Sequence, residues 1–332
     1  MKKIRVAING FGRIGRLVLR AAIESNRKDI EFVAIHDLAP LNENAYLLQY
    51  DSVHGKLKAD VKTDGDYILV AGQKIKCLSE RDPAKLPWKQ MKIDVVMECT
   101  GLFTAADKAR IHIENGAKRV LVSAPSNGAD KTIVFGVNEN KITKKDLIIS
   151  NASCTTNCLA PVLNVLDKKF GIKNGWMTTV HAYTGDQQLL DKNHKDFRRA
   201  RAAALSMIPT TTGAAKAIGL VLPKLDGKMD GIAIRVPTPD VSVVELVLNM
   251  NKRVSPESVN KAIFAAKSDI LGYNDKPLVS IDFTNDAHSS IFDATQTKVI
   301  ENNVLHVTAW YDNEWGFSNR MCDTAVAIGK TL

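Results

Sequence analysis

Cys154 lies in the segment Ser150-Asn-Ala-Ser-Cys-Thr-Thr-Asn-Cys158, directly after a predicted strand and in the first turn of a predicted helix. A helix N-terminus with a nearby imidazole lowers the pKa of a thiol and makes it a ready nucleophile. Ser153 and Thr155 add hydroxyl groups that suit a polar or phosphorylated substrate. The segment therefore predicts a reactive cysteine. The alternative, which the residue type alone favours, is a buried structural cysteine in a capped helix.

His181 is the candidate partner of Cys154 and lies on a predicted strand, in Thr179-Val-His-Ala-Tyr-Thr184. As a base it would hold the thiolate, hydrogen-bond a developing oxyanion and take the proton lost when a hydride departs. A strand histidine by itself is usually structural. The catalytic role therefore requires a fold that brings His181 to Cys154.

Cys158 follows Cys154 by one helical turn, but a Cys-x-x-x-Cys pair lacks the two-residue spacing of thioredoxin-like sites. We therefore expect Cys158 to be a passive neighbour. None of the seven histidines stands at zinc-finger spacing with these two cysteines, so no metal site is predicted.

The run Gly10-Phe-Gly-Arg-Ile-Gly15 fits the pattern G-x-G-x-x-G, after a predicted strand and at the start of a predicted helix. The three glycines, Gly12 among them, allow a tight turn, close approach to a pyrophosphate and close helix–strand packing. The next predicted strand, residues 31–35, ends at Asp37, where a carboxylate can bind an adenosine ribose and repel a 2′-phosphate. The pattern predicts dinucleotide binding with a preference for NAD. The alternative for the glycine run is an ordinary strand-to-helix turn, and the alternative for Asp37 is an ordinary acidic residue in a turn.

Two domains must position these residues, because 332 residues are long for a single hydrophobic core. Before Cys154, strand-like runs alternate with helix-length stretches at 13–25 and 105–115, which is typical of a parallel sheet wrapped by helices. An added hairpin is predicted at 67–77. The predicted strands are 4–8, 31–35, 95–98, 119–123, 132–137 and 147–150.

After Cys154 the pattern changes to a predicted helix, 155–170, followed by long alternating strands at 176–184, 232–250 and 304–310. This alternating pattern predicts an antiparallel sheet. The polar and basic segment 186–209 fits no regular pattern, and long irregular loops in compact domains are usually functional.

The composition, with 45% hydrophobic and 24% charged residues, is ordinary for a soluble globular protein. No stretch approaches 18 apolar residues and no signal peptide is apparent, so we expect a cytoplasmic protein without a membrane partner. Five scattered cysteines predict reduced thiols rather than a disulfide framework. The formal charge of +9 is spread along the chain without a basic tail, so nucleic acid is not expected as the primary partner.

Seven blocks, in order, resemble the phosphorylating glyceraldehyde-3-phosphate dehydrogenase family of bacterial type (class I) over essentially the whole chain. They are Asn9-Gly-Phe-Gly-Arg-Ile-Gly15, Tyr50-Asp-Ser-Val-His-Gly55, Ser150-Asn-Ala-Ser-Cys-Thr-Thr-Asn157, Arg198-Arg-Ala-Arg201, Pro209-Thr-Thr-Thr-Gly-Ala-Ala-Lys216, Arg235-Val-Pro-Thr-Pro239 and Trp310-Tyr-Asp-Asn-Glu314. The resemblance implies an α/β fold: a Rossmann-type doubly wound parallel sheet plus an α+β catalytic domain with a mostly antiparallel sheet. The implied domains are 1–153 for NAD binding, 154–318 for catalysis, and a helix, 319–332, that returns to the first domain.

The same resemblance implies roles for individual residues. Cys154 would be the nucleophile and His181 its acid–base partner. Thr184 and Arg235 would hold the C3 phosphate of the substrate. The attacking inorganic phosphate and the anionic end of the substrate would be held by Ser153, Thr155, Arg199, Thr212 and Gly213, and the cofactor by Arg13, Ile14, Asp37, Arg81, Ser123 and Asn313 beside the three glycines.

The implied reaction has three steps. The Cys154 thiolate adds to the aldehyde of glyceraldehyde 3-phosphate, a hydride leaves for NAD, and inorganic phosphate cleaves the thioester to 1,3-bisphosphoglycerate, a reaction of glycolysis and gluconeogenesis. The resemblance also implies a homotetramer in which segment 186–209 lines the cofactor site of a neighbouring subunit.

One position departs from the family pattern, since NAD-specific members usually carry proline where this chain has Asn193, and Lys192 adds a cation beside it. Asp37 argues the other way, so we predict a preference for NAD with secondary use of NADP. Two alternatives remain open: an erythrose-4-phosphate dehydrogenase, which would hydrolyse the thioester, and RNA binding as a secondary role.

Overall fold

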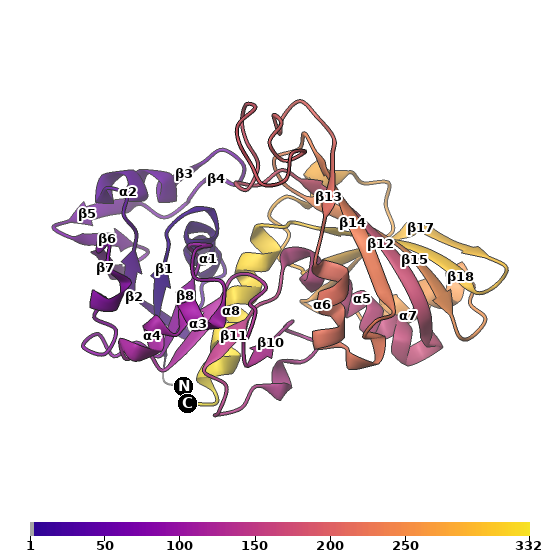
Figure 1. Cartoon of the computed structure of the whole chain (residues 1–332), viewed down its shortest axis with the longest axis horizontal. Helices are drawn as coiled ribbons and strands as arrows, with labels where there is room; N and C mark the ends of the chain where they lie inside the picture. Colours follow the sequence, from indigo (N-terminus) through magenta and orange to yellow (C-terminus); the bar gives the residue numbers. More distant parts are fainter. Residues whose placement is uncertain (1–2) are drawn as a thin grey trace. The chain divides into compact units, whose positions relative to one another are not determined.

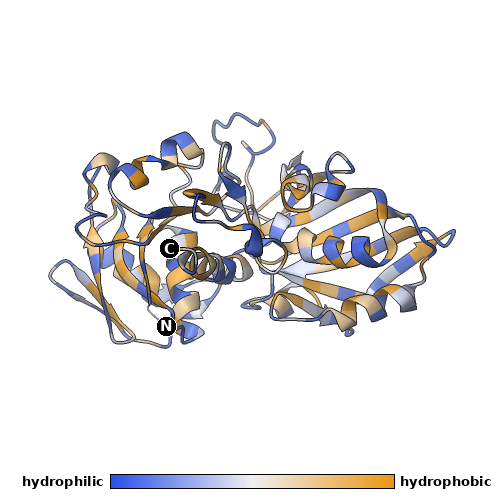
Figure 2. Ribbon diagram, turned by 90° about the horizontal axis from the view of Figure 1, so that it is seen from below, coloured by the Kyte–Doolittle hydropathy of each residue, from blue (hydrophilic) through white to orange (hydrophobic). Residues whose placement is uncertain are grey.

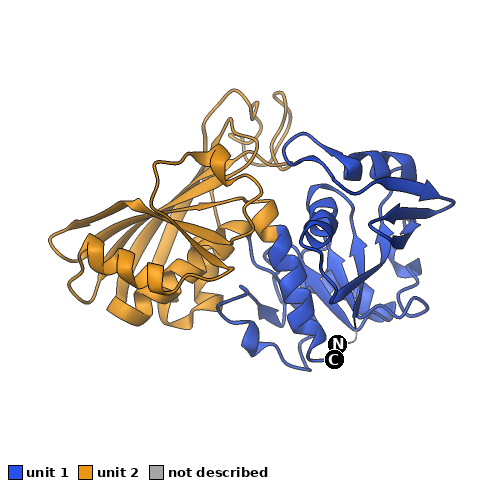
Figure 3. Ribbon diagram, turned by 180° about the vertical axis from the view of Figure 1, so that it is seen from behind, with its two compact units in different colours: residues 1–153, 318–332 blue, residues 154–317 orange. Residues whose placement is uncertain are grey.

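The computed structural model describes residues 3–332 and divides the chain into two compact units (Figure 3). The first unit runs to Ser153 and resumes from Ser318 to Leu332, and the second is Cys154–Phe317. Each unit has its own sheet, and in both of them hydrophobic residues gather on the strands while the connecting loops are largely hydrophilic (Figure 2).

The first unit contains a nine-stranded sheet that is parallel from β10 to β7 and ends in the antiparallel strands β6 and β5. This confirms the predicted parallel sheet and the added hairpin. In sheet order the strands are β10 (Lys131–Thr132), β11 (Ile148–Ser150), β9 (Arg119–Val122), β8 (Val95–Glu98), β1 (Ile4–Asn9), β2 (Ile30–His36), β7 (Gln73–Leu78), β6 (Tyr67–Val70) and β5 (Val61–Asp64). A separate two-stranded pair joins β3 (Tyr50–Asp51) to β4 (Gly55–Lys56).

Strand β1 lies at the centre of this sheet and is buried on both faces, as expected of a strand covered by helices and loops on each side. Ala7 packs in a core cluster with Trp88 and Val96. Ile8 points to the opposite face, where its side chain lies under Gly15 in helix α1 (Arg13–Glu24). This packing fixes the strand-to-helix turn that carries the glycine motif.

The last helix, α8 (Trp315–Gly329), belongs to the first unit from Ser318 onward and packs there on α1. The thiol of Cys322 donates a hydrogen bond to the Val18 carbonyl at 3.6 Å, and Asp323 forms an ion pair with Arg27. The other helices of this unit are α2 (Leu41–Gln49), α3 (Ala106–Ala109) and α4 (Ile111–Glu114), with short 3-10 turns at Pro83–Lys85 and Glu139–Lys141.

The second unit contains a seven-stranded, mostly antiparallel sheet, as predicted, in which only the pairs β12–β14 and β16–β17 are parallel (Figure 1). Its order is β13 (Ile208–Thr211), β14 (Met229–Val236), β12 (Ile172–Ala182), β15 (Ser242–Met250), β18 (Val304–Tyr311), β17 (Ser290–Ile300) and β16 (Leu271–Asn274). The accompanying helices are α5 (Cys154–Phe170), α6 (Ala214–Val221) and α7 (Pro256–Ala265), with 3-10 turns at Pro223–Leu225 and Ser280–Phe283.

The two faces of this second sheet differ. On β12, Met177, Thr179 and His181 alternate on the buried face, against which α5 packs, whereas Trp176 on the opposite face is 48% exposed. The period of two along the strand therefore brings His181 to the same side of the sheet as the helix that begins at Cys154.

Several predicted elements differ from the structure. The strand expected at 132–137 ends at Thr132, because the side-chain amide of Asn138 binds the Val134 N–H and the Thr132 carbonyl, which then cannot extend the ladder. The alternating run 232–250 is two strands separated at Pro237 and Pro239, which lack N–H groups. The helix expected at 105–115 is divided into α3 and α4, and β13 begins inside the segment 186–209.

Candidate active site

Cys154 is the first residue of α5, and its sulfur lies 3.5 Å from Nε2 of His181, near the end of β12. The preceding turn places buried Ala152 at a φ of +57°, a left-handed conformation that non-glycine residues rarely adopt. The structure thus brings together the two residues that the sequence proposed as nucleophile and base.

The protonation of His181 follows from its other nitrogen. Nδ1 lies 2.6 Å from the carbonyl oxygen of Ala182, and a carbonyl can only accept, so Nδ1 carries the hydrogen. Nη1 of Arg235 donates to the same oxygen at 3.0 Å. Nη1 and Nδ1 lie 3.1 Å apart because both nitrogens donate to this one carbonyl oxygen. The lone pair of Nε2 is therefore directed at Cys154 and can accept its thiol proton.

The environment opposes charge on both groups. Burial and the positive charge of Arg235 lower the pKa of His181 to about 3, although the hydrogen bond to Ala182 acts in the opposite direction. Burial raises the pKa of the Cys154 thiol, although Arg235 and hydrogen bonds at Thr155 lower it. The expectation of a lowered thiol pKa was wrong for this structure, because desolvation outweighs the helix N-terminus and the cation.

Tyr311, at the end of β18, is a site residue that the sequence analysis did not assign. Its hydroxyl lies 2.9 Å from Oγ1 of Thr155 and 2.9 Å from Oγ1 of Thr179, and its ring meets the His181 ring edge-on with centroids 6.0 Å apart. The hydroxyl joins the first turn of α5 to β12 and so supports the Cys154–His181 geometry. Its presence in the block Trp310-Tyr-Asp-Asn-Glu314 was the one signal in the sequence.

Arg235 provides a first candidate anion site beside His181. It lies on β14, opposite His181 in the strand register, and Nη1 also donates to Oγ1 of Thr184 at 3.3 Å. Nε of Arg235 is buried without a hydrogen-bond partner among residues 3–332. A buried guanidinium with an unused donor fits the binding of an anion, as predicted for Arg235 and Thr184.

Arg199, Thr212 and Gly213, which are also predicted to bind phosphate, form a second candidate anion site at the end of β13. Thr212 and Gly213 precede α6, where the Thr212 hydroxyl accepts a hydrogen bond from the Ala214 N–H at 3.1 Å. A side chain added at Gly213 would meet no atom within 4 Å, so its backbone is accessible. Arg199 lies near the same strand end, since Nε donates to Oγ1 of Thr210 at 3.0 Å. Ser153 and Thr155 flank Cys154 in sequence.

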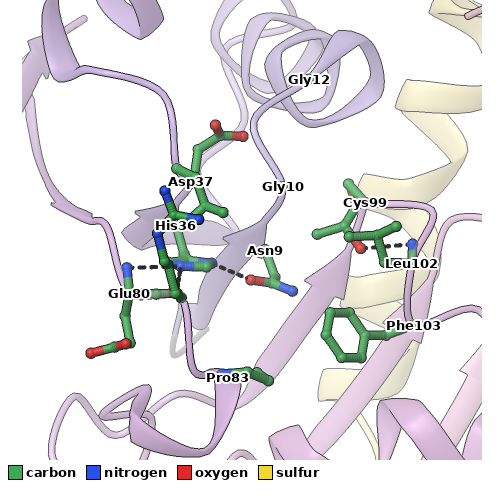
Figure 4. A pocket seen from close by; sticks show the side chains of 13 residues that line it. Asn9, Gly10, Gly12, His36, Asp37, Glu80, Pro83, Cys99, Leu102 and Phe103 are labelled. Atoms are coloured by element: carbon green, nitrogen blue, oxygen red, sulfur yellow. Dashed lines mark hydrogen bonds between the residues drawn. The ribbon is translucent and has the colours of Figure 1, made fainter.

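The first unit contains a cavity of about 340 Å³ at the carboxyl ends of its central strands (Figure 4). It is formed by residues after β1, β2, β7 and β8, where ligands bind in open parallel sheets. The lining residues are Asn9, Gly10, Gly12, His36, Asp37, Leu38, Glu80, Arg81, Pro83, Cys99, Thr100, Leu102 and Phe103.

The three glycines of the motif meet different constraints. Gly10 has a φ of +89°, and a Cβ there would lie 2.6 Å from the Thr100 nitrogen; a Cβ on Gly15 would lie 2.1 Å from the Gly10 carbonyl oxygen. A Cβ on Gly12 would instead meet nothing within 4 Å, although Gly12 lines the cavity. The fold itself therefore requires Gly10 and Gly15, whereas Gly12 leaves room for a group outside the protein, as a dinucleotide pyrophosphate would need.

Asp37 is held with both carboxylate oxygens fixed at the cavity wall. Oδ2 accepts the Phe11 N–H at 2.7 Å and Oδ1 accepts the Ala39 N–H at 2.9 Å. Arg81 also lines the cavity, as predicted. The guanidinium of Arg13 instead pairs with Asp51 at 2.6 Å, which leaves the backbone N–H groups at the start of α1 as the donors of this turn.

The remaining predicted cofactor residues are separated in the structure. Ile14 lies in the first turn of α1 and Ser123 directly follows β9, both in the first unit. Asn313 belongs to the second unit, where its Oδ1 accepts a hydrogen bond from Ser242 at 2.7 Å. Their roles toward a cofactor stay predictions.

A buried polar chain under the cavity was missed by the sequence analysis. Nδ1 of His36 lies 2.6 Å from Oδ1 of Asn9, and Nε2 of His36 lies against the backbone of Glu80 (Figure 4). The side-chain amide of Asn9 donates in turn to Glu98 at 2.5 Å. His112 closes the chain at Glu98 with a distance of 3.0 Å. These contacts fix the cavity wall that includes Asn9, His36 and Glu80. No sequence pattern revealed them, because they join residues of three strands, a loop and a helix.

Comparison with known proteins finds family matches in both parts of the chain. Residues 4–106 match the family described as glyceraldehyde 3-phosphate dehydrogenase, NAD binding domain, and residues 153–313 match its C-terminal domain. The chain belongs to the glyceraldehyde-3-phosphate dehydrogenase family. It is 60% identical over 331 residues to the glyceraldehyde-3-phosphate dehydrogenase of Xanthobacter flavus, covering 98% of this chain and 99% of that protein.

Two further relatives of the glyceraldehyde-3-phosphate dehydrogenase family extend this finding. The protein of Cereibacter sphaeroides is 59% identical, with 99% of each chain covered, and glyceraldehyde-3-phosphate dehydrogenase 1 of Bacillus subtilis is 55% identical, with 98% of each chain covered. The predicted family, fold class, NAD cofactor and oxidoreductase class are confirmed. The erythrose-4-phosphate dehydrogenase alternative has no support from these relatives. Among residues 3–332, no helix combines the length and hydropathy of a membrane span.

Proposed function

We propose that this member of the family oxidises glyceraldehyde 3-phosphate to 1,3-bisphosphoglycerate with NAD and inorganic phosphate, and that Cys154 and His181 carry the chemistry. The observation that supports this most directly is the 3.5 Å contact between Sγ and a histidine nitrogen whose tautomer is fixed by Ala182. The identity of the substrate is inferred from the names of the relatives.

In the first step, the Cys154 sulfur forms a bond to the aldehyde carbon while its proton passes to Nε2 of His181. The same nitrogen then gives the proton to the carbonyl oxygen, which yields a neutral thiohemiacetal. Because Arg235 disfavours a charged imidazole, His181 returns the proton readily. The hydrogen bond to Ala182 keeps the ring oriented throughout.

In the second step, His181 removes the hydroxyl proton of the thiohemiacetal and a thioester forms on Cys154. The turn Gly10–Gly15, Asp37 and Arg81 would hold NAD, which would accept the hydride that leaves the thiohemiacetal carbon. Arg235 and Thr184 hold the C3 phosphate of the substrate, and the unused Nε donor of Arg235 fits that dianion.

In the third step, an oxygen of inorganic phosphate attacks the thioester carbon and the Cys154 thiolate leaves. Arg199, Thr212 and Gly213, with Ser153 and Thr155, hold the attacking phosphate. The product is an acyl phosphate, and a proton from His181 or water restores the thiol.

An assay of NADH absorbance tests the proposal. Purified protein is mixed with glyceraldehyde 3-phosphate and NAD, with and without inorganic phosphate, and the Cys154→Ser variant is run beside it. We expect sustained turnover only with both phosphate and Cys154. Turnover that persists without phosphate would identify thioester hydrolysis instead, and absence of any NAD reduction would contradict the catalytic assignment.

The assembly and the cofactor range are further parts of this proposal. We propose a homotetramer, supported by apolar residues left exposed on one sheet face, Trp176, Ile232 and Val247, and in the segment 186–209, where Phe197 is 88% exposed. Light scattering after gel filtration tests it. Secondary use of NADP, through Asn193, is tested by the ratio of kcat/KM values for the two cofactors.

The location and the domain limits also belong to the proposal. A cytoplasmic location stays a prediction, to be tested by cell fractionation. Residues 1–153, 154–318 and 319–332 are the proposed NAD-binding domain, catalytic domain and returning helix, and limited proteolysis tests where the linkers lie.

A further inference from the structure

The two arginines of the candidate active site are close enough to the same imidazole to act on it, but they have different partners. The positive charges of Arg235 and Arg199 each lower the pKa of His181, and Arg199 also lowers that of Arg235. Both cations therefore act on the same imidazole, that of His181. Their different surroundings predict different affinities for anions.

Arg235 hydrogen-bonds to neutral groups. Its Nη1 donates to the Ala182 carbonyl and the Thr184 hydroxyl, and its Nε has no partner among residues 3–332. The negative charge of Asp186 acts on Arg235 only from a distance, so its guanidinium remains available to a bound dianion.

Arg199 is already neutralised by acidic side chains. Its Nη1 forms an ion pair with Oδ2 of Asp186, and Nε lies 3.7 Å from Asp196. The other donors are also engaged, Nε with Oγ1 of Thr210 at 3.0 Å and Nη2 with the Thr211 carbonyl at 3.2 Å. Any anion that binds Arg199 must share the guanidinium with Asp186.

The two acids on Arg199 have different duties. Asp196 accepts the Arg198 N–H at 2.9 Å and the Thr210 hydroxyl at 2.7 Å, so it holds the loop to β13. Among residues 3–332, the Asp186 carboxylate pairs with Arg199 and lies 3.6 Å from Nε2 of His194, and its side chain is 48% exposed. Asp186 can therefore be neutralised with little loss of local structure.

We propose that Asp186 weakens the binding of inorganic phosphate at Arg199, so that the second anion site is deliberately weaker than the one at Arg235. This rests on the proposed function, in which Arg199 receives the attacking phosphate. Asp186 acts through Arg199 and does not itself contact the reacting atoms. The consequence suits the reaction, because the product carries both phosphate groups and must leave, and a carboxylate close to the second one opposes its retention.

The test compares the KM values for inorganic phosphate and glyceraldehyde 3-phosphate in Asp186→Asn and Asp186→Ala. We expect the KM for phosphate to fall about ten-fold in both variants at low ionic strength, and less at high salt. The KM for glyceraldehyde 3-phosphate should stay within about two-fold, because Asp186 pairs directly with Arg199 and acts on Arg235 only from a longer distance. Asparagine introduces a side-chain amide that can donate a hydrogen bond to phosphate. The alanine variant removes the charge without adding this donor.

Asp191→Asn is the matched control. Asp191 lies in the same segment and pairs with Arg201 at 2.8 Å. Asp191→Asn therefore changes the net charge by the same amount as Asp186→Asn but leaves the ion pair of Arg199 in place. We expect its KM for phosphate to match that of the parent protein. An equal fall in Asp191→Asn would attribute the effect to net charge or loop loosening and overturn the proposal.

Arg199→Gln separates this inference from the proposed function. If it leaves the KM for phosphate unchanged, Arg199 is not the phosphate site and the assignment of that site fails. If it raises that KM while Asp186→Asn and Asp186→Ala leave it unchanged or raise it, Asp186 orients Arg199 and the proposal made here is wrong. A fall in Asp186→Asn alone would assign the gain to the new amide and also overturn it.

Discussion

The two candidate sites of this protein are built in different ways. The candidate cofactor cavity of the first unit depends on a contiguous turn, Gly10–Gly15, whose backbone shape leaves room beside Gly12 for a bound group. The site in the second unit depends on side chains from separate elements: Cys154 on α5, His181 on β12, Arg235 on β14 and Tyr311 on β18. The first site is a backbone site, which should tolerate most side-chain changes but not an added Cβ that clashes with the turn. The second is a side-chain site, in which a single substitution should remove activity while the fold stays intact.

The largest expected effect comes from removing the base. His181→Gln should lower kcat by about 10³, which corresponds to roughly 4 kcal/mol, because it removes the ring nitrogen that lies 3.5 Å from the Cys154 sulfur. The affinity for NAD, followed by fluorescence titration, should not change, since the residues that line the cavity belong to the first unit and His181 belongs to the second.

His306→Gln is the matched control for this change. His306 is on β18 in the same sheet and pairs with Glu245 at 2.5 Å, outside the site. We expect a kcat close to that of the parent protein. If His181→Gln kept more than a tenth of the parent kcat, the side-chain site would not depend on the base assigned to it.

Two glycine substitutions test the backbone site. Gly15→Ala should lower the free energy of unfolding by roughly 3 kcal/mol, because its Cβ would lie 2.1 Å from the Gly10 carbonyl oxygen. Gly12→Ala should fold normally, as its Cβ would meet nothing within 4 Å, but should bind NAD at least ten-fold more weakly. Thermal unfolding and NAD titration of both variants are the measurements. Normal NAD affinity in Gly12→Ala would mean that the pyrophosphate of NAD does not lie against Gly12.

The same difference explains how much the sequence could predict. The glycine turn and the position of Asp37 are local patterns, and periodicity was enough for β1, α1 and β12. The partners of His181 could not be predicted from residue types, because Ala182 contributes a carbonyl and Tyr311 comes from a distant strand. Asp186 was only a polar loop residue until its contact with Arg199 was visible. The thiol pKa was misjudged because sequence reveals a helix N-terminus more readily than burial.

Arg235 provides a test by pH. Its charge lowers the pKa of both Cys154 and His181, so Arg235→Gln should raise both. The alkylation rate of Cys154 by iodoacetamide depends on thiolate, and its pH profile should therefore move upward by roughly one unit. Arg198→Gln, at an exposed residue of the segment 186–209, is the control and should leave the profile in place. A profile that moves to lower pH would show that Arg235 does not act on the pair through its charge.

The smallest effect tests whether the side-chain site needs its supporting hydroxyl. Tyr311→Phe keeps the ring against His181 but leaves the buried hydroxyls of Thr155 and Thr179 without their shared partner, which should cost roughly 1–3 kcal/mol in the free energy of unfolding. We expect kcat to fall about ten-fold through misplacement of the first turn of α5, with NAD affinity unchanged. Tyr273→Phe, at a half-buried tyrosine whose ring stacks on Phe292, is the matched control. Equal losses in the two variants would show that Tyr311 contributes packing only, and the comparison between the two sites would then rest on His181 and Arg235.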